Sequence, residues 1–400
     1  MKKQPLTIPG HILEQFPSVS SSTYLNSCAR GLLPLNAKIA VEELLADRMA
    51  GSTDKNTLFD VIRLVRSRFS KLISANADEI AITKNVSEGL SIIAASMSWR
   101  SGDNVVVCID LEHPNNVYPW INLRERAGIE IRTVAARNGH IPTDEMCNLI
   151  DDRTRLVSVS SVSFSPGFRT NWASLGKLCQ KRDVFLLVDA AQSIGILDTN
   201  VNELGIDGLA VSTQKGLLGL YGFGFLYCRK HWAERLTPVY LARFGVDLGE
   251  DAHEAAKGTF RYKLMPGALR FDLGNYNYPG AVAANASLAI LAEVGTPAID
   301  AHVTTLSHRL VAGLLDLGLP VAGGAPGSHL GSIVSVGSFG EGGHDSTDDP
   351  ETASLYQHLT KNDVILTIRQ GMLRMAFHLY NTENDVDHVI ELAQQWSKSR

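Results

Sequence analysis

Short apolar segments alternate with helical segments through the first two thirds of the chain, and this alternation limits the folds that the chain can adopt. The segment "VFLLVDA" (184–190) is apolar and rich in strand-forming residues, and "WASLGKLCQKR" (172–182) before it has helical spacing. Such alternation is typical of βαβ units around a mostly parallel sheet. The predicted strands are 104–110, 129–136, 155–164, 184–190, 208–214 and 222–229, and the predicted helices include 143–150, 172–182, 281–295, 298–318 and 384–399.

The pattern of predicted elements changes near residue 280, where long amphipathic helices and short strands replace the alternation of strands and helices. This change predicts a smaller α+β domain after a large α/β domain. We expect an N-terminal arm (1–20) that packs on the small domain, a large domain (21–279) and a small C-terminal domain (280–400).

Charge and cysteine content exclude several classes of partner. The chain has 400 residues and a formal net charge of -5, from 37 basic and 42 acidic residues without a long run of one sign. Such a balance gives no electrostatic support for binding nucleic acid or an anionic membrane. The five cysteines form no C-x-x-C pair, and no apolar stretch is long enough to cross a bilayer. We therefore expect a cytoplasmic protein that binds small molecules.

Two segments place a carboxylate and an amine where a parallel sheet binds ligands. Asp189 ends the apolar run "VFLLVD", and Lys215 follows the strand-like segment in "STQKG". A buried carboxylate requires an arginine or a protonated ring nitrogen beside it. A desolvated lysine has a lowered pKa and can form imines or act as a base. The alternatives are a helix N-cap for Asp189 and a surface lysine for Lys215.

These two motifs, "LVDAAQS" and "STQK", resemble the pyridoxal 5'-phosphate (PLP) core of the class V aminotransferase family. The resemblance implies a PLP-dependent transferase fold of type I, in which a large domain with a mostly parallel mixed sheet precedes a smaller α+β domain. It extends, in the family's order, over "YLNSCARGLLP" (24–34), "ITKNVSEGL" (82–90), "DLEHPNNVYPW" (110–120), "ALRFDLGN" (268–275) and "LRMAFHLYNTENDVD" (373–387).

The resemblance also implies roles for individual residues around PLP. Lys215 matches the lysine that bonds the cofactor, Asp189 the partner of the ring nitrogen, and Gln192 the partner of the ring hydroxyl. His113 matches the histidine stacked on the ring, although a lone histidine is often structural. The residues that match phosphate contacts are Val86, Ser87, Ser212 and Gln214, with Gly274 and Asn275 supplied by the neighbouring subunit of a homodimer with a shared active site.

Substrate contacts are expected on the segment "ILTIRQGMLRMAFHLY". Alternation places Arg374 on one strand face, where a guanidinium suits bidentate binding of an amino acid carboxylate. Arg374 matches the family's carboxylate-binding arginine. Arg369 is a second candidate, although a surface salt bridge is an alternative for it. Asn26 is a candidate for the pocket wall, and Phe164 stands where the family often has asparagine.

The reaction type is predicted from what the chain lacks. Only "QGML" separates Arg369 from Arg374, so the loop that carries a nucleophilic cysteine in cysteine desulfurases is absent. On this ground the sequence predicts that the protein is not a persulfide-forming desulfurase. We place aminotransferase first, then a Cβ–S lyase, then an amino acid racemase or epimerase, with Lys215 as proton carrier in each.

Other classes of protein fit the pattern less well. A nucleotide-binding Rossmann protein would carry its glycine fingerprint after the first strand, where none stands. A catalytically inactive PLP-fold binding protein would be expected to lack Lys215 or Asp189. A zinc hydrolase is disfavoured because "HEAAK" (253–257) lacks the second histidine of H-E-x-x-H, and we predict no metal site.

Overall fold

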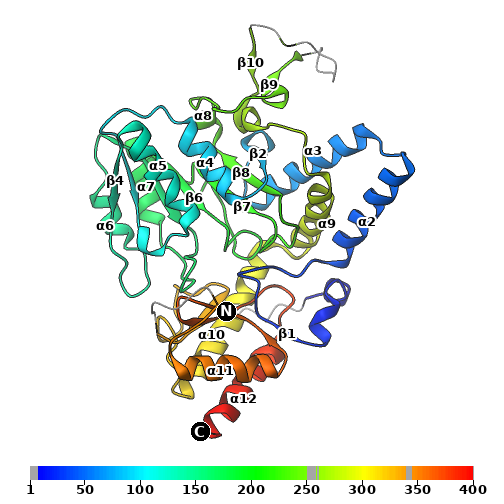
Figure 1. The fold of residues 1–400 in the computed structure, drawn as a ribbon, viewed down its shortest axis with the longest axis vertical. Helices are drawn as coiled ribbons and strands as arrows, with labels where there is room; N and C mark the ends of the chain where they lie inside the picture. Colours follow the sequence, from blue (N-terminus) through cyan, green and yellow to red (C-terminus); the bar gives the residue numbers. More distant parts are fainter. Residues whose placement is uncertain (1–7, 250–257, 259–260, 339–344, 400) are drawn as a thin grey trace.

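A mixed sheet forms the centre of the protein (Figure 1). The computed structural model describes residues 8–249, 258, 261–338 and 345–399. Within these residues, a seven-stranded sheet has the order β2-β8-β7-β6-β5-β3-β4, in which β8 runs antiparallel to both neighbours and the other pairs are parallel. The strands are β2 (Ile80–Thr83), β3 (Asn104–Val107), β4 (Glu130–Thr133), β5 (Thr154–Ser160), β6 (Phe185–Asp189), β7 (Gly208–Ser212) and β8 (Gly224–Cys228).

Strand side chains alternate between two buried clusters, one on each face of the sheet. In β6, Phe185 and Leu187 belong to one cluster, whereas Leu186 and Val188 belong to the other. The period of two follows from strand geometry, and burial on both faces explains why these segments read as continuous apolar runs. All six strands predicted from sequence lie in this sheet. The sequence did not predict β2, a four-residue strand at the edge of the sheet.

Helices cover the two faces of the sheet. Residues of α4 and α5 pack in the cluster on one face, and residues of α3 and α7 pack in the cluster on the other. Helix α9 lies against α2 and α3, at the side of the sheet (Figure 1). These helices are α2 (Leu35–Ala50), α3 (Lys55–Leu72), α4 (Val86–Ser96), α5 (Tyr118–Ala127), α6 (Thr143–Asn148), α7 (Ala173–Arg182), α8 (Lys230–Ala233) and α9 (Tyr278–Val294).

The C-terminal part contains a small antiparallel sheet with the order β11-β14-β13. Helix α12 begins with a reciprocal cap, in which Thr382 and Asp385 bond each other's backbone and side chains, as "TEND" suggests. The other elements are α1 (Gly10–Leu13), β1 (Thr23–Tyr24), β9 (Val246–Asp247), β10 (Lys263–Leu264), α10 (Thr296–Asp316), β11 (Ile333–Val336), α11 (Pro350–Lys361), β12 (Val364–Ile365), β13 (Thr367–Arg369), β14 (Met372–Ala376) and α12 (Glu383–Lys398).

The N-terminal segment contacts the C-terminal part. Phe16 is buried, and its ring lies 5.0 Å from that of Tyr380, while strand β1 pairs in parallel with β12. Residues 1–7 of the expected arm and the segment 253–257 lie outside the described residues. The α/β fold predicted from the sequence is confirmed, and the division into parts at residues 20 and 279 stays a prediction.

Within the described ranges, no single helix is long and apolar enough to cross a membrane. Helices α9 and α10 satisfy the criteria of length and composition only when taken together, and the chain bends by 78° between them.

Candidate active site

A cavity of about 290 Å³ opens at the carboxyl ends of the central strands. Ser160, Asp189 and Ser212 are the last residues of β5, β6 and β7, and all three line the cavity, as expected for a ligand site of an open parallel sheet. The cavity brings together eight of the predicted site residues: Val86, Ser87, His113, Asp189, Gln192, Ser212, Gln214 and Lys215.

Asp189 lies at the bottom of this cavity with 5% of its surface exposed. Its Oδ1 accepts a hydrogen bond from the backbone N–H of Ala191 at 2.9 Å. Burial raises the pKa of the Asp189 carboxyl, and the Ala191 bond and the charge of Lys215 only partly oppose this. A protonated ring nitrogen beside the carboxylate would stabilise its charged form.

Lys215 follows β7 and lines the same cavity as Asp189, with which it interacts electrostatically. Desolvation lowers the pKa of its amine, which favours the neutral, nucleophilic form. The segment that contains Gly31 packs next to this lysine. The backbone N–H of Gly31 donates to the Gln214 carbonyl at 2.9 Å. A Cβ on Gly31 would lie 2.3 Å from the Lys215 carbonyl oxygen, so this approach requires glycine. The surface-lysine alternative does not describe this environment.

The start of α4 forms the anion-binding end of the cavity. Ser212 accepts a hydrogen bond through its Oγ from the Val86 N–H at 2.8 Å, and Asn85 caps the helix by accepting from the Glu88 N–H at 2.9 Å. Ser87 and Gln214 also line this end. A helix N-terminus with nearby hydroxyl and amide groups suits a phosphate.

Gln192 and His113 line the same cavity as Asp189 and Lys215. The amide nitrogen of Gln192 donates to the Cys28 carbonyl at 3.1 Å, which fixes the side chain against the segment that carries Gly31. His113 caps the short 3-10 helix Pro114–Asn116 by accepting from the Asn115 N–H at 3.2 Å. Both side chains line the cavity. Their assigned contacts with the cofactor ring remain predictions.

Glu112 is a site residue that the sequence analysis missed. It is 7% exposed, and its carboxyl accepts hydrogen bonds from the Ser160 N–H, the Ser160 hydroxyl and the Asn116 amide. Burial raises the pKa of this carboxyl to about 7. The signal in the sequence was a charged residue directly before His113, after the short 3-10 helix Ile109–Leu111 that follows β3.

Arg374 is a buried cation that does not line the cavity itself but contacts Phe164, which does. Its side chain is on β14 with 1% exposure, and its Nε has no hydrogen-bond partner. One terminal nitrogen donates to the Phe164 carbonyl, and the guanidinium carbon lies 4.9 Å from the centre of the Phe164 ring. Burial lowers the pKa of Arg374, and the positive charge of Arg374 contributes to the lowered pKa of Lys215, so the two cations lie near each other.

The remaining predicted residues do not line the cavity. Asn26 is 7% exposed, forms a backbone bridge with Ala376 beside Arg374, and has a buried Oδ1 without a partner. Arg369 forms an ion pair with Asp345, although its own side chain is only 11% exposed, and its assignment to the substrate stays a prediction. Gly274 and Asn275 are absent from the cavity wall of this chain.

The turn between Arg369 and Arg374 is as short as the sequence suggested. Strands β13 and β14 pair in register from Arg369↔Met372, so the turn consists of Gln370 and Gly371, both with positive φ (50° and 82°). Such a two-residue turn suits a tight hairpin and carries no thiol.

The fold and this site define a PLP-dependent enzyme of fold type I. The described residues fit the cofactor, because a buried carboxylate and the amine of a half-buried lysine, each with a pKa shifted toward its neutral form, face one cavity with an anion site at its end. The family model "Aminotransferase class-V" matches residues 45–389, and the chain belongs to that family. Its cofactor is pyridoxal 5'-phosphate.

Relatives align over nearly the whole chain. An uncharacterized aminotransferase, YcbU, of Bacillus subtilis is 29% identical over 96% of this chain and 97% of its own length. A probable cysteine desulfurase of Methanothermobacter thermautotrophicus is 28% identical over 96% and 97%. The apo structure of a cysteine desulfurase from Thermococcus onnurineus superposes with a TM-score of 0.82 at 24% identity, over 99% of both chains, and shows the shared fold.

These relatives correct one prediction from the sequence. The prediction that placed an aminotransferase first and excluded a cysteine desulfurase is wrong, because proteins named probable cysteine desulfurase match this chain from end to end. The physical error was to treat the absence of a thiol from one hairpin as the absence of a persulfide-forming reaction. Cleavage of a C–S bond needs the amine, the cofactor and a bound carboxylate, whereas the thiol that receives the sulfur can come from elsewhere.

Proposed function

We propose that the protein uses PLP to cleave the Cβ–S bond of L-cysteine, as a cysteine desulfurase does. The observation that carries the proposal is Arg374, a guanidinium with 1% exposure whose Nε lacks a partner and which has no carboxylate in ion-pair distance within the described residues. An unpaired buried cation is costly, and a substrate carboxylate would offset that cost. The desulfurase relatives support a sulfur-containing amino acid as the substrate.

Residues of this chain have separate roles around the cofactor. Bound PLP supplies an aldehyde that condenses with the substrate amine and a ring that withdraws electrons from its Cα. Asp189 keeps the ring nitrogen protonated, and Ser87, Gln214 and the start of α4 hold the phosphate. The Nζ of Lys215, neutral once released, accepts the Cα proton and later returns a proton to the product.

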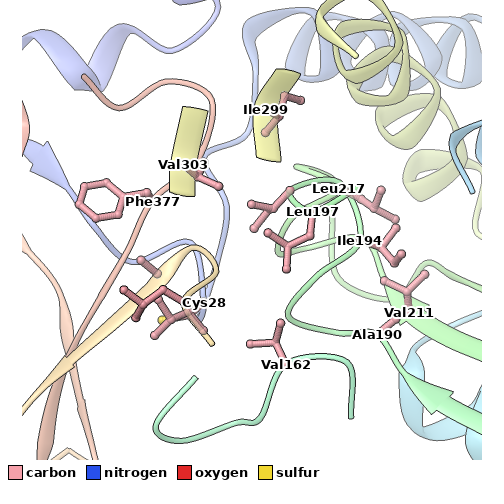
Figure 2. Close-up of a cluster of buried hydrophobic side chains, with 14 of the residues drawn as sticks. Cys28, Val162, Ala190, Ile194, Leu197, Val211, Leu217, Ile299, Val303 and Phe377 are labelled. Atoms are coloured by element: carbon pink, nitrogen blue, oxygen red, sulfur yellow. The ribbon is translucent and has the colours of Figure 1, made fainter. Parts of the chain in front are cut away.

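The overall reaction balances with one thiol acceptor. Cysteine and a thiol, RSH, give alanine and a persulfide, RSSH: the Cβ–S bond breaks, an S–S bond forms, and the thiol proton ends on alanine. Because the Gln370–Gly371 turn carries no cysteine, we propose that the acceptor thiol comes from outside the chain. Cys28 is 2% exposed, within the apolar cluster behind the site (Figure 2), so we do not assign it this role.

The test is product analysis with L-cysteine and dithiothreitol as the acceptor. We expect alanine and sulfide in equal amounts, abolished in Lys215→Ala and retained in Cys28→Ala. Without dithiothreitol, L-cysteine is the remaining thiol acceptor, so alanine should form together with cysteine persulfide in place of sulfide. Pyruvate with ammonia, or accumulation of a keto acid with the amine form of the cofactor, would contradict the proposal.

We also propose that the enzyme is a homodimer with a shared active site. Gly274 and Asn275 match phosphate contacts, but they do not line the cavity of their own chain, so a second copy would have to supply them. Mixing Lys215→Ala with Asn275→Asp should restore part of the activity if one site in the mixed dimer is intact. A monomer in sedimentation experiments would contradict the proposal.

A further inference from the structure

Phe164 contacts both ends of the site. It follows β5 in the loop that precedes Arg169, and its side chain lines the cavity. The His113 ring meets the Phe164 ring edge to face, with centroids 5.2 Å apart and planes at 79°. Arg374 lies over the same ring at 4.9 Å and donates to the Phe164 backbone carbonyl.

These contacts explain how a buried guanidinium can keep one orientation. Arg374 has no acidic partner within the described residues, and its Nε is without a hydrogen bond. Within the described residues, the aromatic contact and the hydrogen bond of its guanidinium both come from one residue, Phe164. A cation over an aromatic face is stabilised most strongly when both are shielded from water.

We propose that Phe164 is a positioning residue, whose ring orients Arg374 so that the free Nε edge faces the carboxylate of the amino acid substrate. This inference rests on the proposed function, because it presumes an amino acid at the site. Phe164 contacts Arg374 through its backbone carbonyl and through its ring. The carbonyl remains after any substitution of Phe164, whereas the ring can be removed. The ring should matter for binding the substrate carboxylate and not for binding the amine.

The test compares two ligands that differ only in a carboxylate. L-Alanine and ethylamine are titrated into the PLP-loaded protein, and dissociation constants are read from the change in cofactor absorbance. In Phe164→Leu we expect alanine binding to weaken about fivefold to tenfold, the size of one desolvated cation–π contact, and ethylamine binding to stay within about twofold. Phe164→Tyr, which keeps the ring, should bind alanine like the wild type.

Phe168→Leu is the matched control, because Phe168 lies in the same loop but packs against His140 and His329. It should leave the alanine-to-ethylamine ratio unchanged. For L-cysteine turnover, Phe164→Leu should raise KM with little change in kcat.

Three outcomes would overturn the inference. They are equal weakening of both ligands in Phe164→Leu, failure of Phe164→Tyr to restore alanine binding, and the same ratio change in Phe168→Leu. Each leaves the proposed function standing, since the wild type still binds alanine. A wild-type protein that bound neither ligand would overturn the proposed function together with this inference.

Discussion

The two ends of the active site are built in different ways. At the cofactor end, Asp189 and Ser212 terminate strands of one sheet, and the start of α4 lies beside them. At the substrate end, Arg374 and Phe164 meet although 210 positions separate them in the chain. Strand ends in one sheet therefore fix the cofactor site locally, whereas the substrate site depends on how remote segments pack.

The largest effect is expected at the cofactor end. Asp189→Asn should lower kcat about a thousandfold, because a neutral amide cannot keep the ring nitrogen protonated. The fold should survive, since burial already disfavours the charged form of Asp189. Steady-state kinetics and circular dichroism measure the two effects, and a variant with near wild-type kcat would remove Asp189 from the chemistry.

A smaller effect is expected at the substrate end. Arg374→Lys should raise KM about a hundredfold, because an ammonium cannot reproduce two parallel hydrogen bonds to a carboxylate. Arg369→Lys is the control and should change KM by less than about threefold, since that side chain pairs with Asp345. Equal effects of the two substitutions would show that the carboxylate is bound differently.

The roles of single residues around PLP came from the family resemblance and stay predictions. The positions of Asp189 at a strand end and of Lys215 just after one could be predicted from the apolar runs alone. The substrate end could not. Nothing local predicts that the Phe164 ring contacts both His113 and Arg374, or that Asn26 lies beside β14. Strand β2 was missed because an edge strand of four residues carries little periodic signal.

Glu112, which accepts hydrogen bonds from Ser160 at the cofactor end, should make the free energy of unfolding depend on pH. Its folded pKa is raised from 4.5 to about 7, so the unfolded chain loses this proton first as pH rises. Stability should therefore fall by about 3 kcal/mol between pH 4.5 and 7, relative to Glu112→Gln, which does not titrate. Chemical unfolding of both proteins at pH 5 and pH 7.5 checks this, and parallel curves would contradict it.

The smallest effect concerns the hairpin of the substrate end. Gly371 has φ of 82°, so Gly371→Ala should destabilise the protein by about 1 kcal/mol through backbone strain. The cofactor end lies in another sheet, so its absorbance with bound PLP should not change. A changed spectrum would show that the two ends are coupled more tightly than their construction suggests.

The central claim is that Lys215 is the amine that bonds the cofactor opposite Asp189. It is tested most directly by loading the protein with an equal amount of PLP, reducing it with borohydride and locating the added mass in peptides. The account predicts the modification on Lys215, and none at that amount of PLP in Lys215→Ala. A modification on another lysine, with Lys215 left intact, would contradict the account.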